Sequence, residues 1–229
     1  MSTNPVDLFT KEMAQGYDQR NRALSPIIDC LHFLIGLILK DIPANARVLC
    51  VGAGTGAEIL ALSEAFPDWS FVALDPSAAM LDICRERVAI AGIADRCEFV
   101  HGYVDDLPVE STFDVAISIL VAHFVARDKR VDFFQQMISR LGSGGYLVNM
   151  EFSTDLTAEE FPIMLKNWEA VQVLMGATPE SLATLLTQLK EVLTVLSPQE
   201  TESVLRQSGI GHPIHFFQAL MLHGWYGRK

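Results

Sequence analysis

The sequence predicts an α/β fold built on a doubly wound, mostly parallel sheet. From residue 47 onward, apolar strand-like runs alternate with helix-forming segments, an arrangement that implies parallel strands joined by helices on both faces. The first run, residues 48–51, leads into a loop with three glycines, and residues 57–66 behind it have helical composition. Two strand-like segments, 210–220 and 221–228, have little between them and predict a closing antiparallel hairpin.

The apolar runs and the turn residues between them place the individual elements. We expect strands at residues 47–51, 69–74, 97–101, 113–119 and 144–151, with helices at roughly 57–66, 77–91 and 127–140. Residues 141–145 contain three glycines and indicate a turn before the fifth strand. Residues 152–208 predict a helical insertion, with helices at 159–175 and 179–196 and a third that begins at Ser197 and Pro198.

Residues 1–45 predict a helical N-terminal segment. Residues 27–39 are largely apolar, but Asp29 and His32 interrupt the run, which is shorter than the ~20 residues that cross a bilayer. We therefore expect a buried helix and no membrane segment, and the polar start at residues 1–7 indicates no signal peptide. Phe9, Met13 and Tyr17 share one helix face, which is either a packing stripe or a lid over a ligand site.

Composition limits the classes of function. With 229 residues that are 50% hydrophobic, the chain is long enough for one sizeable core, and we expect a single domain over residues 1–229. A formal net charge of −11 repels phosphate backbones, so a small-molecule substrate is favoured over a nucleic acid. Four cysteines without C-x-x-C spacing indicate neither a disulfide framework nor a zinc site, which fits a reducing cytoplasm.

The glycine loop is the strongest functional signal. A tight turn from strand to helix needs glycine for its backbone angles and for close approach of a ligand, and it directs the free N–H groups of the new helix outward. Gly52, Gly54 and Gly56 thus indicate a nucleotide-cofactor loop. Gly52, Gly54 and Ala57 also satisfy the loose dinucleotide pattern, which leaves an NAD-dependent oxidoreductase as an alternative.

The second expected strand ends in a carboxylate. Asp75 follows residues 69–74, where it could accept hydrogen bonds from two ribose hydroxyls. Pro76 and Ser77 then open a helix, and Met80 places an apolar side chain where an adenine face could rest. These residues resemble the class I methyltransferases that depend on S-adenosylmethionine (SAM), whose glycine loop is G-x-G-x-G and whose second strand ends in D-x-S-x-x-M.

The resemblance implies a Rossmann-like sheet of seven strands with the C-terminal hairpin, and SAM as the cofactor. It also implies the residues that contact the cofactor. We expect these to be Tyr17, Gly52, Ala53, Gly54, Gly56, Asp75, Pro76, Met80, Tyr103, Val104 and Ile119. Two positions depart from the family pattern. Tyr103 stands where a carboxylate usually meets the adenine amino group, so that contact falls to the Val104 backbone with the Tyr103 phenol, or to Asp105 if the loop shifts. Cys50 stands where an acid usually precedes the loop.

The acceptor side of the site is expected beyond the fourth strand. Its carboxyl end faces the place where the cofactor methyl group should lie, so His123 is a candidate general base or a residue that fixes the loop. The helical insertion resembles the substrate cover of small-molecule methyltransferases, with Phe124, Trp168 and Met175 as candidate substrate contacts. Methyl transfer from a sulfonium is an in-line displacement that requires no metal.

The sequence therefore predicts a cytoplasmic SAM-dependent methyltransferase that moves a methyl group to an O, N or C atom of a small molecule. A homodimer is compatible with the apolar helices of the insertion, and neither a nucleic-acid partner nor a membrane is expected. Besides the oxidoreductase, two alternatives stay open. One is a protein that binds SAM without catalysis and serves as a regulator or scaffold, and the other is an enzyme that converts SAM to a carboxylated derivative.

Overall fold

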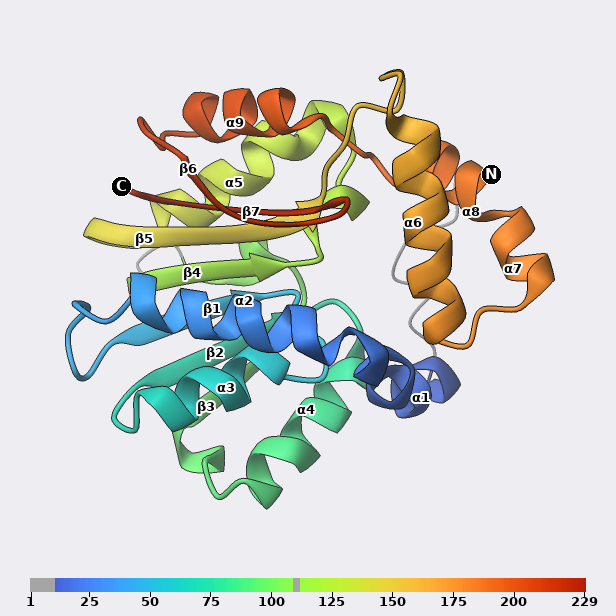
Figure 1. Cartoon of the computed structure of the whole chain (residues 1–229). Helices are drawn as coiled ribbons and strands as arrows, with labels where there is room; N and C mark the ends of the chain where they lie inside the picture. The colour runs from blue at the N-terminus through green and yellow to red at the C-terminus, as the bar shows by residue number, and fades with distance from the viewer. Residues whose placement is uncertain (1–10, 109–111) are drawn as a thin grey trace.

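The computed structural model describes residues 11–108 and 112–229 and shows one sheet of seven strands flanked by helices (Figure 1). The strand order is β3-β2-β1-β4-β5-β7-β6. The strands are β1 (Arg47–Val51), β2 (Ser70–Asp75), β3 (Cys97–His101), β4 (Phe113–Ile119), β5 (Leu141–Phe152), β6 (Ile214–Ala219) and β7 (Leu222–Arg228). The first five are parallel, whereas β7 pairs antiparallel with both β5 and β6. The expected Rossmann-like sheet with its closing hairpin is thus confirmed.

One boundary differs from the sequence prediction. Residues 141–145, expected as a turn, form the first part of β5, and the register against β4 shifts between Phe113 and Val115. Gly144 has a φ of +76°, a conformation that favours glycine, so the glycines allow an irregular strand where a plain turn was expected.

The helices alternate with the strands as expected up to β5. They are α1 (Lys11–Asn21), α2 (Ser25–Ile38), α3 (Ala57–Ala65), α4 (Ala78–Ile90), α5 (Arg130–Ser139), α6 (Phe161–Leu174), α7 (Pro179–Ala183), α8 (Leu185–Thr187) and α9 (Pro198–Gln207). The prediction of a single helix over 179–196 is wrong. The helix is interrupted at Thr184, and the segment ends in a π-helical turn, Gln188–Val192. Ser197 caps α9 as expected, accepting a hydrogen bond from the N–H of Glu200.

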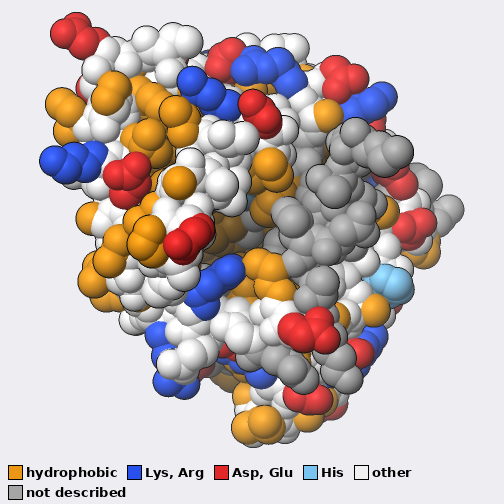
Figure 2. Space-filling model, turned by 90° about the vertical axis from the view of Figure 1, so that its right-hand side faces the viewer, with side chains coloured by type: hydrophobic (Ala, Val, Ile, Leu, Met, Phe, Trp, Pro, Cys, Tyr) orange, Lys and Arg blue, Asp and Glu red, His pale blue; other side chains and the backbone are white. Residues whose placement is uncertain are grey.

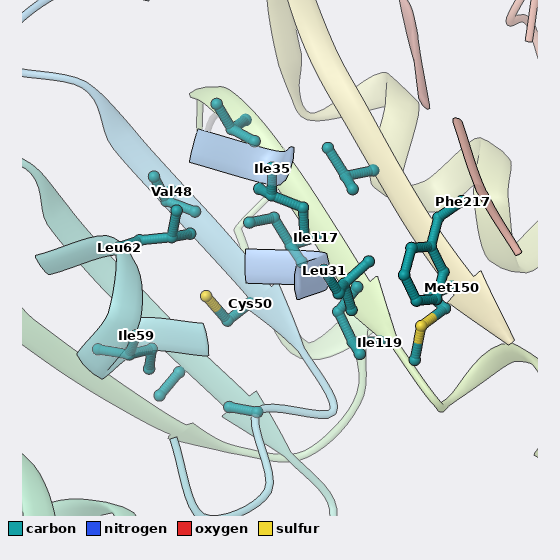
Figure 3. Close-up of a cluster of buried hydrophobic side chains, with 14 of the residues drawn as sticks. Leu31, Ile35, Val48, Cys50, Ile59, Leu62, Ile117, Ile119, Met150 and Phe217 are labelled. Carbon is teal, nitrogen blue, oxygen red and sulfur yellow. The ribbon is translucent and has the colours of Figure 1, made fainter. Parts of the chain in front are cut away.

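Side chains along the central strands point alternately to the two faces of the sheet, so the interior contains two hydrophobic cores. Val48 and Cys50 of β1 face a core formed with α2, α3 and α4, while Leu49 and Val51 face a core formed with α5 and α9. Figure 3 shows Leu31 and Ile35 of α2 in the first core, with side chains from β1 and β4. Both faces of β1 are therefore buried, as its continuous apolar run predicts.

The N-terminal segment contains an apolar helical stretch. Residues Glu12–Ile38 are long and apolar enough to cross a membrane by length and composition alone. Core helices of soluble proteins meet the same criterion, and α2 buries Leu31 and Ile35 against the sheet, so the stretch is weak support for a membrane span. Phe9, expected on one helix face with Met13 and Tyr17, lies outside the described residues.

The strand order determines where a ligand can bind. Chain connections lead from β1 outward to β3 on one side and from β4 outward on the other, so the order reverses between β1 and β4. In open α/β sheets this reversal leaves a crevice at the carboxyl ends of the two strands. The glycine loop after β1 and the segment after β4 both lie at that crevice.

Candidate active site

A cavity of about 470 Å³ lies at the carboxyl ends of the central strands. The face in Figure 2 shows a hollow edged by hydrophobic side chains, with acidic and basic side chains close by. The cavity is lined by Tyr17, Val51, Gly52, Gly54, Leu74, Asp75, Pro76, Ser77, Met80, Gly102, Tyr103, Val104, Asp105, Ile119, Leu120, Val121, Phe124, Val125, Ala126, Lys129, Asp132, Phe133 and Gln136. Loops that follow four strands thus meet the N-terminal helix and α5 around one space.

The glycine loop forms the floor of this cavity with backbone alone. Gly52, Gly54 and Gly56 have φ values of +66°, +54° and +80°, which side chains of L-residues rarely adopt. A Cβ atom on Gly52 would lie 2.3 Å from Val121, and one on Gly56 would lie 2.6 Å from the sulfur of Cys84. A Cβ on Gly54 would meet Met80 at 3.5 Å and the carbonyl oxygen of Gly52 at 3.9 Å, both ordinary contacts, so this glycine keeps the cavity open and the other two allow the loop to pack.

Asp75 connects the glycine loop to the start of α4. Its Oδ2 accepts a hydrogen bond from the N–H of Gly54 (2.9 Å), and its Oδ1 accepts one from the N–H of Ser77 (2.8 Å). Burial raises the pKa of this carboxyl, and the two backbone donors oppose that shift. Each carboxylate oxygen has a second acceptor position, so Asp75 retains the capacity to hold a diol at the cavity wall.

The loop after β3 supplies the next wall. Val104 is buried at the cavity, whereas the Tyr103 side chain is 56% exposed and lies at its rim. The N–H of Tyr103 donates to Asp106 (2.7 Å), which fixes the turn and leaves Asp105 as the carboxylate of this loop that lines the cavity. Of the contacts considered from the sequence, Tyr103, Val104 and Asp105 all line the cavity.

The segment after β4 closes the cavity with apolar side chains. Ile119, Leu120, Val121 and Phe124 all line it. Leu120 has a φ of +58°, and its N–H donates to the carbonyl of Met150 (2.7 Å). A positive φ in a leucine costs about 1–2 kcal/mol, and such strain is often found at ligand sites.

His123 lies behind this wall and does not line the cavity. It is 2% exposed, its ring contacts that of Phe124 at a tilt and that of Phe152 edge-on, and its Nδ1 accepts a hydrogen bond from the N–H of Phe152 (3.3 Å). Burial, with the nearby Arg130 cation, lowers its pKa to about 3. A histidine in this position is neutral and inward-facing at ordinary pH, so the geometry favours fixing the loop over acting as a base.

Four more residues expected at the site do not line the cavity. Ala53 and Gly56 belong to the glycine loop but face the interior, Trp168 is buried against Phe152, and Met175 ends α6. The remaining expected cofactor contacts all line the cavity, together with Phe124. The structure therefore brings these expected cofactor contacts together around one cavity and packs Trp168 of α6 against Phe152 of β5.

Sequence reasoning missed one wall, which α5 provides. Lys129, Asp132, Phe133 and Gln136 line the cavity, and their spacing places them on one helix face. Three of these residues are polar, so the face is indistinguishable from an ordinary solvated helix face in the sequence. The one signal was Phe133 beside the core residue Phe134.

A buried ion pair anchors this wall. Arg130 of α5 and Glu151 of β5 are both fully buried and in direct contact, and Thr201 of α9 donates to the second carboxylate oxygen (2.9 Å). Arg130 also donates to the carbonyl oxygens of Thr194 (2.7 Å) and Val125 (3.3 Å). Because Val125 lines the cavity, the pair fixes the loop after β4 as well as α5 and α9.

Comparisons with known proteins agree with this architecture. A family model described as a methyltransferase domain matches residues 48–145. A demethylmenaquinone methyltransferase from Clavibacter sepedonicus is 31% identical over 92% of this chain and 84% of its own length. A carboxy-S-adenosyl-L-methionine synthase from Campylobacter lari is 25% identical over 78% of this chain and 75% of its own length.

Solved structures show the same fold. An O-methyltransferase family 2 protein from Planctomyces limnophilus, solved with apigenin, has a TM-score of 0.64 at 17% identity and covers 96% of this chain. This chain spans 62% of that protein's length. The fold, the glycine loop and the relatives together define the class: the chain belongs to the class I SAM-dependent methyltransferases, and SAM is its cofactor. Its relatives include both enzymes that methylate an acceptor and enzymes that modify SAM itself.

The cavity residues fit SAM. Gly54 leaves the loop open to a ligand where a Cβ would intrude, Asp75 has acceptor positions that would hold a ribose diol, and Val104 and Asp105 line the same cavity. Family membership favours this assignment over the dinucleotide alternative that the loose glycine pattern left open. Among the described residues, no group of three or more His, Cys, Asp or Glu side chains is arranged to hold a metal ion.

Proposed function

We propose that this enzyme transfers the methyl group of SAM to a carbon atom of an apolar, ring-containing small molecule of the quinol type. The observation that carries the proposal is the wall after β4, where Ile119, Leu120, Val121 and Phe124 present only apolar side chains to the cavity. The demethylmenaquinone methyltransferase relative, which matches 92% of this chain, supports the same acceptor class.

When bound, SAM supplies a methyl group on a positively charged sulfur, which a nucleophile displaces in line. The chain contributes position and exclusion of water. Gly52 and Gly54 hold the cofactor through backbone, Asp75 orients it, and the apolar wall strengthens electrostatic interactions by removing water. With His123 buried behind the wall, the acceptor reaches the site in a form that is already nucleophilic, as a quinol anion is.

A second candidate is synthesis of carboxylated SAM, which the Campylobacter lari relative performs by its name. That product carries a carboxylate beside the sulfonium, and a carboxylate in an apolar pocket requires a cationic partner. Among the described lining residues, the cation is Lys129, on the α5 wall, and the wall after β4 presents none. The wall after β4 therefore favours an apolar ring over a carboxylate.

A single incubation distinguishes these outcomes. Purified enzyme is given SAM with an isotopic label in its methyl group, together with a reduced demethylated naphthoquinone, a catechol, a small amine or an α-keto acid carboxyl donor. Label that appears in the naphthoquinol on carbon supports the proposal. Label that stays in a heavier SAM derivative, seen by mass spectrometry only with the carboxyl donor, establishes the second candidate and overturns the first. Transfer to the catechol or amine alone retains the methyltransferase and rejects the acceptor class.

A further inference from the structure

The N-terminal helix is joined to the glycine loop by a cluster of three side chains. In α1, Asp18 accepts a hydrogen bond from the hydroxyl of Thr55 (2.7 Å), and its other oxygen lies 3.1 Å from the guanidinium of Arg87. Arg87, from α4, also donates to the carbonyl oxygen (3.0 Å) and the hydroxyl (2.9 Å) of Thr55. Three segments that are far apart in the sequence therefore meet at one threonine.

Thr55 occupies a decisive position in the glycine loop. It stands between Gly54 and Gly56 and is 3% exposed, so its side chain is fixed and its backbone is continuous with the cavity floor. Asp75 holds Gly54 from the other side through the hydrogen bond to its N–H. A loop rich in glycine has high conformational freedom when unsupported, and the two carboxylates, Asp75 and Asp18, restrain it from opposite sides.

The same cluster fixes the cover of the cavity. Tyr17 precedes Asp18 in α1 and lines the cavity. Burial raises the pKa of the Tyr17 phenol, so it keeps its proton at neutral pH and serves as a hydrogen-bond donor. The contacts that hold Asp18 against Thr55 therefore also fix the position of Tyr17 at the cavity.

The cluster adds little to folding stability, because it is partly exposed. The side chains of Arg87 and Asp18 are 31% and 44% exposed, and such pairs typically contribute about 0–1 kcal/mol. Their effect on a ligand can be larger, because a restraint on the floor and the cover changes the affinity of every group that both present.

We propose that Asp18 and Arg87 are positioning residues for the cofactor: they clamp α1 to the glycine loop through Thr55, so that Tyr17 closes over bound SAM and slows its release. The inference rests on SAM binding, which the family establishes, and is independent of the identity of the acceptor. Binding linkage is reciprocal, so bound SAM must in turn tighten α1.

The test compares Asp18→Asn and Arg87→Gln with two control variants at an ion pair on α4, the helix that carries Arg87. Asp82 and Arg85 of α4 form an exposed ion pair (2.7 Å), so Asp82→Asn and Arg85→Gln remove equivalent charges away from the loop. Stopped-flow measurement of SAM release should show dissociation faster by about fivefold or more in each clamp variant and unchanged in the controls. The double variant should release SAM no faster than the faster single variant, because both act through one contact.

Hydrogen exchange separates this role from a merely structural one. In the wild type, SAM should slow amide exchange in α1 as well as in the glycine loop, and in Asp18→Asn the added protection of α1 should disappear. The melting temperature of the free variants should fall by no more than about 4 °C.

Several results would overturn the proposal. SAM release at the wild-type rate in a folded Asp18→Asn variant is one, and equal acceleration in the Asp82 and Arg85 controls is another. Amide hydrogen exchange in α1 of the wild type that is unchanged by SAM would also contradict the proposal. If Asp18→Asn does not fold, Arg87→Gln is the deciding variant. SAM dissociation from Arg87→Gln at the wild-type rate would show that the clamp does not slow release.

Discussion

Removing the Asp75 carboxylate tests the cofactor site most directly. In Asp75→Ala, the ribose hydroxyls lose their acceptor, and the N–H groups of Gly54 and Ser77 lose theirs. Hydrogen bonds to a charged group contribute about 1.5–3 kcal/mol, so SAM affinity should fall by roughly tenfold to a hundredfold. Calorimetric titration of the purified variant with SAM measures this loss.

The structure adds a second consequence and a milder variant. Because Asp75 also joins the loop to α4, its removal should lower the free energy of unfolding by about 1–2 kcal/mol. Asp75→Asn keeps one acceptor oxygen and the shape of the side chain, so its affinity should lie between those of the wild type and Asp75→Ala. Asp68→Asn, at an exposed position between α3 and β2, controls for the loss of charge. An Asp75→Ala protein that folds and binds SAM as tightly as the wild type would remove Asp75 from the site.

Three further predictions use neighbouring positions. Gly54→Ala should melt within a few degrees of the wild type but show no thermal shift with SAM. Gly52→Ala should melt at a much lower temperature, because its Cβ would overlap Val121. Equal behaviour of the two variants would contradict the loop geometry. The free energy of unfolding of the wild type should decline as pH falls from about 6.5 toward 3, with a slope of up to about 1.4 kcal/mol per pH unit. The reason is that His123 binds a proton in the unfolded chain but stays neutral when buried in the folded one. His123→Asn should remove that part of the slope in denaturant titrations and change turnover by less than about fivefold; a steep rate loss with an altered pH profile would restore His123 as the base. Glu151→Ala should destabilise the fold by about 3–5 kcal/mol in chemical denaturation, since it leaves Arg130 buried without its counter-charge, and a small loss would mean that water reaches the pair.

The fold was predictable because it depends on local pattern. A run buried on both faces, as in β1, is continuous in the sequence, and glycine punctuation places the turn after it within a residue. The insertion was less predictable, because residues 179–196 have helical composition throughout and the break at Thr184 depends on packing that buries Leu185 and Leu189 in the first core. Composition indicates that helix forms there and does not fix its length.

The candidate site was predictable where one segment supplies both the backbone and the ligand contact. Asp75 ends β2, and Gly54 and Met80 come within five residues of the end of a strand, so strand position places all three at the cavity. His123 also follows a strand, yet the direction in which its side chain turns depends on Phe152 of another strand, which spacing alone does not reveal. The contact between Asp18 and Arg87 joins residues 69 positions apart and leaves no local pattern.

Cys50 shows how these long-range contacts bear on a departure from the family pattern. The position where the family pattern has an acid is occupied by a thiol that is 3% exposed, and burial raises its pKa well above the ordinary value, so it stays neutral and packs in the core. A glycine loop without that acid needs other restraints. Asp75 holds Gly54, and Asp18 with Arg87 holds Thr55, so the loop is ordered from the second strand and from the N-terminal helix. It follows that Cys50→Asp should not strengthen SAM binding in this chain: the added carboxylate would have to be buried without a partner, and the expected result is a less stable protein with unimproved affinity, measured by melting and calorimetry. Tighter binding in Cys50→Asp would show that the loop still lacks a restraint that the family's acid provides.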